Sequence, residues 1–282
     1  MKPGFTPSEQ LCAILVLSCD AYADTWAGFF KLLERYWPDC PFNVYLGTDS
    51  LRPSIPGCRV LNTKQQGLPW TSCAAEYLKQ IPNAFVLTLL DDFYFRSRID
   101  TNKVRQLIQT AHEKAYQQLR MVAIPGPAST NVASPVGPLS GEYRVSTQCA
   151  LWDRKHLISI LQTPLSIWEF EKNASNSAAG NYVGVYRDVI LYRGLLTHHV
   201  IEKGCWIPHE VLRLRWLEGI RVEKRRPLLP LKYYSFYMMA TLTSRLLRRT
   251  SAGKQIKDRI KQLALRLMPL LMAKLGGPAG RK

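Results

Sequence analysis

Two unbroken apolar runs constrain the fold of this chain more than any other feature. Residues 11–18 and 85–90 contain aliphatic, aromatic and small side chains with hardly a polar one between them. Runs of this length are too short to span a membrane. They are typical of strands buried on both faces, as in a parallel sheet that helices cover.

Segments with helical spacing alternate with further strand candidates along the chain. Strands are also expected at residues 43–47, 60–61, 120–124 and 143–151, with a long loop rich in Pro, Gly, Ser and Ala at residues 125–141. The expected helix starts are Asp24 as a cap, Thr71 or Ser72, Asp100 or Thr101, and Arg154. This alternation predicts an α/β fold, a mostly parallel sheet flanked by helices.

Acidic residues stand where several of these strands end. They are Asp20, Asp49, Asp91 and Asp92. Ligands of open α/β sheets collect at the carboxyl ends of the strands, so these acids are the first candidates for a functional site.

Asp91 and Asp92 form the sharpest local signal. Two adjacent carboxylates directly after a buried strand are costly to place together unless something neutralises them. A hard divalent ion that bridges phosphate oxygens would do so, which makes Asp92 and Asp91 candidate metal ligands. The alternative is a solvated turn between a strand and a loop.

Asp20 and Tyr22 follow the first strand. The carboxylate of Asp20 can accept hydrogen bonds from a base or a ribose, and the ring of Tyr22 can stack on a base. Both are therefore candidate ligand-binding residues. The alternative for Asp20 is an ordinary turn residue.

A second acidic site lies in the segment that contains Glu169 and Glu171. Ser166 with Glu169 three residues later fits a capping box, which gives Glu169 a structural explanation as well as a place among the catalytic candidates. Glu171 does not fit that motif. It is a candidate general base among aromatic neighbours, or else a glutamate on a helix surface.

Among basic residues, His199 and Lys203 are candidates for contact with a metal or a diphosphate. His198 and His199 are adjacent, so on a strand at most one of them could bind a given ion. Lys203 could neutralise a diphosphate. No P-loop, G-x-G-x-x-G or G-x-S-x-G motif occurs, which argues against P-loop NTPases, Rossmann cofactor enzymes and α/β-hydrolases.

Seven cysteines occur, and no two of them form a C-x-x-C pair. An odd count without that spacing argues against a disulfide framework and against a zinc ribbon. The first residues also lack the pattern of a signal peptide. A cytoplasmic location is expected.

Positive charge is concentrated at the C-terminal end of the chain. The net charge is +17, and residues 224–282 contain fifteen Lys and Arg against one acid, a net of +14, which leaves +3 for residues 1–223. Residues 256–267 place apolar side chains on one helical face and basic ones off it. This pattern predicts a basic amphipathic tail that holds the protein at an anionic membrane surface. The alternative is a helix packed on the body of the protein.

In their order, several of these segments resemble a family of bacterial GT-A-like glycosyltransferases of surface-polysaccharide biosynthesis. The resemblance spans residues 11–206. It rests on residues 18–26, on Trp70 before a helix, and on residues 89–93, 148–152, 168–171 and 203–206.

The resemblance implies a GT-A-like (Rossmann-like) catalytic domain over residues 1–223 that binds a nucleotide-sugar donor, with Trp70 in the donor site. It also implies that Asp91 and Asp92 stand where the metal-binding D-x-D acids of the family stand, for Mg²⁺ or Mn²⁺, and that Glu171 stands where a base could act. The two acids are adjacent here, which departs from the usual D-x-D spelling and leaves open whether Asp92 alone binds the metal.

The expected function is direct displacement of a nucleoside diphosphate by a hydroxyl of a glycan or lipid-linked acceptor. Two alternatives stay open: a polyanion-binding protein without catalytic activity that acts through the basic tail, and a nucleotidyltransferase on a similar scaffold. The nearly neutral body argues against a specific nucleic-acid partner.

Overall fold

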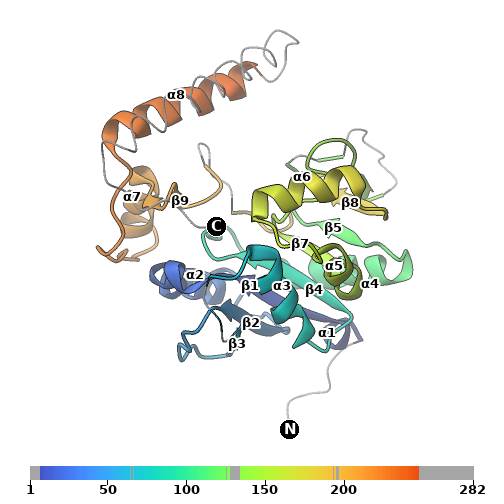
Figure 1. The fold of residues 1–282 in the computed structure, drawn as a ribbon. Coiled ribbons are helices and arrows are strands. Elements are labelled where there is room, and N and C mark those ends of the chain that lie inside the picture. The colour runs from blue at the N-terminus through green and yellow to red at the C-terminus, as the bar shows by residue number, and fades with distance from the viewer. Residues whose placement is uncertain are drawn as a thin grey trace. The chain divides into compact units, whose positions relative to one another are not determined.

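The computed structural model describes residues 7–63, 65, 67–124, 126–127, 134–192, 194 and 197–247. The chain divides into two compact units between Tyr192 and Arg193. The first unit contains the predicted sheet (Figure 1). The proposed division into a catalytic domain and a tail after Glu223 concerns function and stays a prediction.

The described part of the first unit is an α/β structure around an eight-stranded sheet with the order β3-β2-β1-β4-β7-β5-β8-β6. Its strands are β1 (Cys12–Leu17), β2 (Asn43–Thr48), β3 (Cys58–Asn62), β4 (Phe85–Leu90), β5 (Gln118–Arg120), β6 (Val136–Pro138), β7 (Ala150–Asp153) and β8 (Tyr182–Val185). The β3-β2-β1-β4 half is parallel throughout, and β5 is parallel to β8. Strand β7 runs antiparallel to both its neighbours. The prediction of a mostly parallel sheet is confirmed.

The helices and turns of this unit connect and cover the strands. They are α1 (Pro7–Leu11), the 3₁₀ turn η1 (Asp20–Tyr22), α2 (Ala23–Tyr36), α3 (Trp70–Lys79), α4 (Thr101–Glu113), α5 (Arg154–Ile160) and α6 (Ile167–Ser177).

The two apolar runs form the central strands, as predicted. Every residue of β1 and β4 is buried. Ala13, Leu15 and Leu17 of β1 belong to one core cluster with residues of α3, α5 and α6, so these three helices cover one face of the sheet (Figure 1). The residues between them, Ile14 and Val16, point to the opposite face.

Two predicted strands were wrong in extent. The strand expected at residues 143–151 begins only at Ala150, because residues 144–147 use their backbone and side chains to bind α6 instead of a strand. The strand expected at residues 120–124 is β5, which ends at Arg120.

The predicted helix caps had mixed outcomes. Asp100 caps α4 through the backbone N–H of Lys103, as expected. Asp24 lies inside the first turn of α2, whose N-cap is Tyr22, so that prediction was wrong. Helix α3 begins at Trp70 after Pro69, and the hydroxyl of Thr71 donates to the carbonyl of Thr163 instead of capping the helix.

The described residues of the second unit form a small hairpin and two helices. Strands β9 (Ile201–Glu202) and β10 (Cys205–Trp206) pair antiparallel, and helices α7 (Pro208–Trp216) and α8 (Leu231–Leu247) follow. Cys205 packs with Leu229 and Tyr233, so the start of α8 belongs to the core of this unit.

Two predictions on cysteines and membrane spans can be compared with the structure. All seven cysteines, which lie in the described part of the chain, are outside any disulfide. Among the described residues no helix is long and apolar enough to cross a membrane. The amphipathic segment predicted at residues 256–267 lies outside the described residues.

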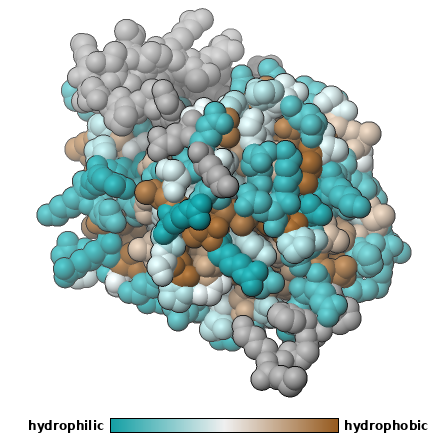
Figure 2. Space-filling model, turned by 60° about the horizontal axis from the view of Figure 1, so that its bottom comes forward, coloured by the Kyte–Doolittle hydropathy of each residue, from teal (hydrophilic) through white to brown (hydrophobic). Residues whose placement is uncertain are grey.

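The surface drawn in Figure 2 is mostly hydrophilic, with smaller hydrophobic areas showing between the polar side chains. Such a mixture is ordinary, since apolar atoms contribute much of any protein surface. Exposed apolar side chains therefore indicate a binding surface only where several of them gather on one helix or loop.

Candidate functional site

The order of the parallel strands reverses at β1. Strand β2 pairs with β1 on one side, and β4 pairs with it on the other. In open α/β sheets, such a reversal leaves a crevice beyond the carboxyl ends of the two diverging strands, where ligands bind. The residues after β1 and β4 therefore define the candidate site.

A hydrogen-bonded group connects these two strand ends. The hydroxyl of Ser18, directly after β1, donates to the carboxylate of Asp91, directly after β4. The indole Nε1 of Trp26 in turn donates to Ser18 Oγ at 2.7 Å. Thr25 Oγ1 lies 3.4 Å from the same Asp91 oxygen. Asp91 is fully buried, and these donors offset the cost of burying its charge.

The start of α2 is held against the segment that follows β4. The hydroxyl of Tyr94 donates to the carbonyl of Thr25 at 2.6 Å. A Cβ at Gly28 would lie 2.7 Å from that hydroxyl, so the absence of a side chain at Gly28 permits the contact. This packing fixes Thr25 and Trp26 where they reach Ser18 and Asp91.

Asp92 stands next to this group, and its side chain is 8% exposed. Phe93 follows, with its ring 4.7 Å from that of Tyr192 between centroids. The structure thus brings both predicted acids to the edge of the sheet where the strand order reverses.

Asp20 and Asp49 bind each other's backbone across the ends of β1 and β2. Asp49 N donates to Asp20 at 3.1 Å, and Asp20 N donates to Asp49 at 3.2 Å. The carboxylate of Asp20 also accepts from the N–H groups of Ser50 and Leu51 and from Ser50 Oγ at 2.6 Å. Burial raises the pKa of Asp49, and the nearby Asp20 charge adds to that effect. These contacts make Asp20 part of a turn, and its predicted role toward a ribose or base stays a prediction.

Tyr22 and Trp70 are both packed against protein. Tyr22 is buried in η1, which leaves little of its ring for a base. Trp70 is half-buried at the start of α3, with its ring 5.5 Å from that of Phe170. Their predicted donor-binding roles stay predictions.

Glu171 of α6 is a buried carboxylate with a defined set of donors. It is 5% exposed, and its Oε1 accepts from Ser146 Oγ at 2.9 Å, Thr147 N at 2.6 Å and Thr147 Oγ1 at 2.8 Å. Among the described residues no hydrogen bond reaches its other oxygen, Oε2. One oxygen is therefore fixed by the protein, and the second is available to another partner.

Two arginines hold the loop that supplies these donors. Arg120 of β5 is fully buried, and its Nη2 donates to the carbonyls of Tyr143 and Arg144. Burial lowers the pKa of Arg120 to about 10, although the neighbouring Tyr192 and Glu171 oppose this shift. Arg144 donates to the carbonyls of Ser175 and Ala178 at the end of α6. The loop and α6 are thus fixed to each other at both ends.

A chain of contacts leads from the acid pair to Glu171. Tyr192, whose ring contacts Phe93, donates from its hydroxyl to Gln148 Oε1 at 3.2 Å. Gln148 N donates to Ser146 Oγ at 3.3 Å, and Ser146 binds Glu171. The two acidic sites predicted from sequence are therefore connected within the first unit.

Glu169 caps α6, as predicted. Its carboxylate accepts from Ser166 N at 2.9 Å, and Ser166 Oγ accepts from Glu169 N at 3.4 Å. Hydrogen bonds that the hydroxyl and the backbone N–H of Ser166 donate to the Glu169 carboxylate lower the pKa of Glu169. Its proposed place among the catalytic residues stays a prediction.

The predicted His199 and Lys203 lie in the second unit. His199 Nε2 is 2.9 Å from Glu202 Oε2. Lys203 occupies the hairpin turn between β9 and β10 with a φ of 51°. Their predicted contacts with a metal and a diphosphate stay predictions.

Asp91 and Asp92 suit a divalent cation in chemistry but do not complete its coordination. Among the described residues, no three His, Cys, Asp or Glu side chains gather as metal ligands. Mg²⁺ is commonly held by one or two carboxylates, with phosphate oxygens and waters as the remaining ligands. The acid pair fits that arrangement.

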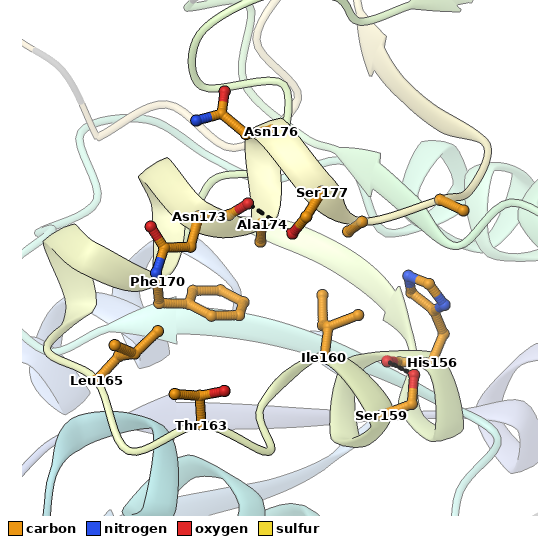
Figure 3. Close-up of a pocket in the computed structure, with 12 residues that line it drawn as sticks. His156, Ser159, Ile160, Thr163, Leu165, Phe170, Asn173, Ala174, Asn176 and Ser177 are labelled. Atoms are coloured by element: carbon orange, nitrogen blue, oxygen red, sulfur yellow. Dashed lines mark hydrogen bonds between the residues drawn. The ribbon is translucent and has the colours of Figure 1, made fainter.

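A cavity of about 710 Å³ lies between α5 and α6 (Figure 3). Its wall includes His156, Asn173 and Asn176, with Phe170 and Ile160 as apolar neighbours. None of the strand-end residues or the Glu171 donors lines it, so we assign it no part in the candidate site.

Sequence reasoning missed the roles of Ser18, Ser146, Thr147 and Tyr192. Ser18 stands directly after a buried strand, as the acids do, and that position could have indicated it. The other three come from a segment expected to be a strand and from a loop. Ser146 and Thr147 lie 25 and 24 residues from Glu171, and Tyr192 lies 44 residues from Gln148, so the local sequence gives no sign of these contacts.

Comparison with known proteins identifies no family. No family model matches the chain, and no curated protein does. Among solved structures, S. aureus TarS is similar at 12% identity with a TM-score of 0.45, over 82% of this chain and 43% of the TarS chain. CMP:2-keto-3-deoxy-manno-octonic acid synthetase is similar at 13% identity with a TM-score of 0.43, over 74% of this chain and 98% of the synthetase chain. A Thermus thermophilus 2-C-methyl-D-erythritol 4-phosphate cytidylyltransferase is similar at 10% identity with a TM-score of 0.42, over 74% of this chain and 98% of the cytidylyltransferase chain.

Proposed function

We propose that this chain is a glycosyltransferase that moves a sugar from a nucleotide-sugar donor to a hydroxyl of a glycan or lipid-linked acceptor. The observation that supports this most is the acid pair at the point where the strand order reverses, connected to a second buried carboxylate, Glu171. The acid pair suits a cation that binds a diphosphate, and Glu171 suits the hydroxyl of an acceptor. The sequence resemblance to GT-A-like glycosyltransferases agrees with this division.

The donor diphosphate would lie at the ends of β1 and β4. Asp91 is fully buried and Asp92 is 8% exposed, so Asp92 is the better candidate for direct contact with a bound cation. Such a cation, Mg²⁺ or Mn²⁺, would stabilise the charge of the leaving nucleoside diphosphate.

Glu171 would take the proton of the acceptor hydroxyl on Oε2. The three hydrogen bonds to Oε1 hold the carboxylate in one orientation, as a positioned base requires. The acceptor oxygen then bonds to the anomeric carbon as the bond to the diphosphate breaks. The nucleoside diphosphate leaves, and the proton stays on Glu171.

The remaining elements of the proposal lie after Tyr192 in the sequence. Lys203 would neutralise diphosphate charge, and His199 is a further candidate ligand. The basic residues 224–282 would hold the enzyme at the cytoplasmic face of an anionic membrane, near a lipid-linked acceptor. Of these, residues 248–282 lie outside the described structure.

A thermal-shift panel tests the proposed function. The full chain is mixed with nucleoside diphosphates, nucleotide sugars, nucleoside triphosphates and a single-stranded oligonucleotide, each with and without Mg²⁺ or Mn²⁺. The expected result is stabilisation by one nucleoside diphosphate and its sugar conjugate, followed by release of that diphosphate when an acceptor is added.

Two outcomes would contradict the proposal. Stabilisation by a triphosphate with release of pyrophosphate would indicate a nucleotidyltransferase. Stabilisation by the oligonucleotide alone would indicate a polyanion-binding protein.

A further inference from the structure

Exposed large apolar side chains are concentrated in the second unit. Of the ten such residues among those described, seven lie between Leu212 and Leu242. They are Leu212, Trp216, Leu217, Leu228, Leu231, Met239 and Leu242.

Helix α7 separates its apolar residues onto two sides. Leu214 and Glu210 are buried, and they are four residues apart on the same stripe. Leu212 and Trp216 are also four residues apart, and they occupy the opposite, exposed stripe. Trp216 is 73% exposed, and Leu217, just after the helix, is 77% exposed. The end of α7 thus presents an apolar edge to solvent.

Positive charge surrounds this edge. Residues 212–228 contain six Lys and Arg and two acids. One of the acids, Glu218, is buried and pairs with Arg213 at 2.9 Å, and Arg213 also pairs at 2.9 Å with the buried Glu210 of α7. The other basic residues are Arg215, Arg221, Lys224, Arg225 and Arg226, against Glu223 alone. The guanidinium of Arg215 lies 5.3 Å from the ring of Trp216.

A cavity of about 530 Å³ lies beside the same edge, within the second unit. Arg215, Arg221, Lys224 and Arg226 line it together with one acid, Glu223, over an apolar wall that includes Trp206. Trp206 is 1% exposed, and its Nε1 is buried with no hydrogen-bond partner in the described part of the chain. A buried N–H without an acceptor is unfavourable, so a negatively charged oxygen that reached it would be stabilised.

We propose that the end of α7 and residues 217–228 form a docking surface for an anionic phospholipid bilayer. Leu212, Trp216 and Leu217 enter the interface, where amphipathic tryptophan is favoured. The basic residues around the cavity bind head-group phosphates. Lys224, Arg225 and Arg226 belong to the basic segment 224–282 that is proposed above to hold the protein at a membrane. The inference therefore rests on that part of the proposed function and extends it to a defined surface, but it does not depend on the proposed transferase reaction.

The exposed aliphatic side chains distinguish this occupant from nucleic acid. Nucleic-acid surfaces combine basic residues with aromatic rings on which bases stack. Leu212 and Leu217 offer neither stacking nor a hydrogen bond. A bilayer accommodates aliphatic, aromatic and basic side chains together.

Vesicle sedimentation of the full chain tests the proposal. Vesicles of phosphatidylcholine alone are compared with vesicles that also contain phosphatidylglycerol. The double variant Leu212→Ala with Trp216→Ala is expected to bind the mixed vesicles at least about tenfold more weakly, because two buried apolar side chains are lost. Arg221→Ala with Lys224→Ala is expected to lose about fivefold per residue, and high salt should reduce that difference.

Matched controls come from the first unit. Trp168→Ala removes a tryptophan that is 69% exposed on α6, and Lys155→Ala removes an exposed lysine on α5. Both should bind the mixed vesicles as the unchanged chain does. Circular dichroism melting must show that the α7 variants keep their fold.

Three results would overturn the proposal. In the first, folded Leu212→Ala with Trp216→Ala binds mixed vesicles as tightly as the unchanged chain. In the second, the unchanged chain binds neither kind of vesicle. In the third, a single-stranded oligonucleotide binds through Arg221 and Lys224 while Leu212 and Trp216 have no effect on any binding.

Discussion

Ser18 and Asp91 are separated by 73 residues, yet the hydroxyl of one donates to the carboxylate of the other across the ends of β1 and β4. The contact is possible because these two strands are parallel neighbours, with Leu17 opposite Leu90. It fixes the orientation of the first acid of the pair.

Ser18→Ala should destabilise the protein. A hydrogen bond to a buried carboxylate is lost, and Asp91 keeps fewer donors, so we expect the free energy of unfolding to fall by about 2 kcal/mol. Urea denaturation measures this. Ser159→Ala, on the exposed surface of α5, should change it by less than about 0.5 kcal/mol. Equal effects of the two changes would show that the Ser18 contact contributes little.

Asp92→Asn should abolish or strongly reduce transfer and remove the response of activity to divalent ions. The amide keeps the shape of the side chain and removes the charge that a cation needs. Donor-dependent transfer, measured across a series of Mg²⁺ and Mn²⁺ concentrations, is the readout. Full activity with an unchanged metal response would show that Asp92 is not a metal ligand.

Glu171→Gln should abolish turnover while donor binding persists. A general base contributes about 10² to 10⁴ in rate, so the loss should lie in kcat, while the thermal shift with the nucleoside diphosphate should remain. Glu169→Gln is the matched change two residues away, and it should weaken the cap of α6 without abolishing transfer. If the two phenotypes are exchanged, the base has been assigned to the wrong glutamate.

The edge of the sheet could be predicted because its signals are local. A buried run followed by two acids indicates a strand end, and parallel topology brings such ends to one edge. The capping box of Ser166 and Glu169 is likewise a pattern within four consecutive residues. In each case neighbouring residues contain the information.

The environment of Glu171 could not be predicted, for the opposite reason. Its donors, Ser146 and Thr147, lie 25 and 24 residues away in a segment whose apolar pattern favours a strand. Only the packing of α6 against that loop, held by Arg144, brings them together. The contact of Tyr192 with Gln148 depends on tertiary structure in the same way.

His156 should make stability depend on pH. Burial lowers its pKa below the usual 6.5, against the smaller opposing effect of Asp153, and its Nε2 lies 2.8 Å from the hydroxyl of Tyr182. Below pH 6.5 the unfolded chain binds the proton more readily than the folded one, so stability should fall as the pH decreases. Urea midpoints between about pH 7.5 and pH 5.5 should fall less steeply in His156→Gln. An unchanged slope would show that other groups cause the dependence.

Removal of the basic tail should weaken binding to anionic vesicles, provided that the deletion spares the second unit. A chain that ended at Glu223 would lose Leu229 and Tyr233, which pack on Cys205, so a change in binding could reflect loss of fold. A chain that ends at Leu247 keeps these contacts and α8. It removes residues 248–282, which contain ten Lys and Arg and one acid, a net charge of +9. Each basic residue near an anionic surface contributes about 1 kcal/mol.

We therefore expect the shortened chain to bind phosphatidylglycerol-containing vesicles at least about tenfold more weakly. The part of the binding that remains should depend on Leu212 and Trp216 and be less sensitive to salt, since apolar contacts are not screened. Sedimentation at low and high salt measures both the loss of binding and the salt sensitivity of the binding that remains. If the full and shortened chains bind equally, with no effect of salt on either, the tail does not dock on the membrane, and a tail packed on the body of the protein is favoured.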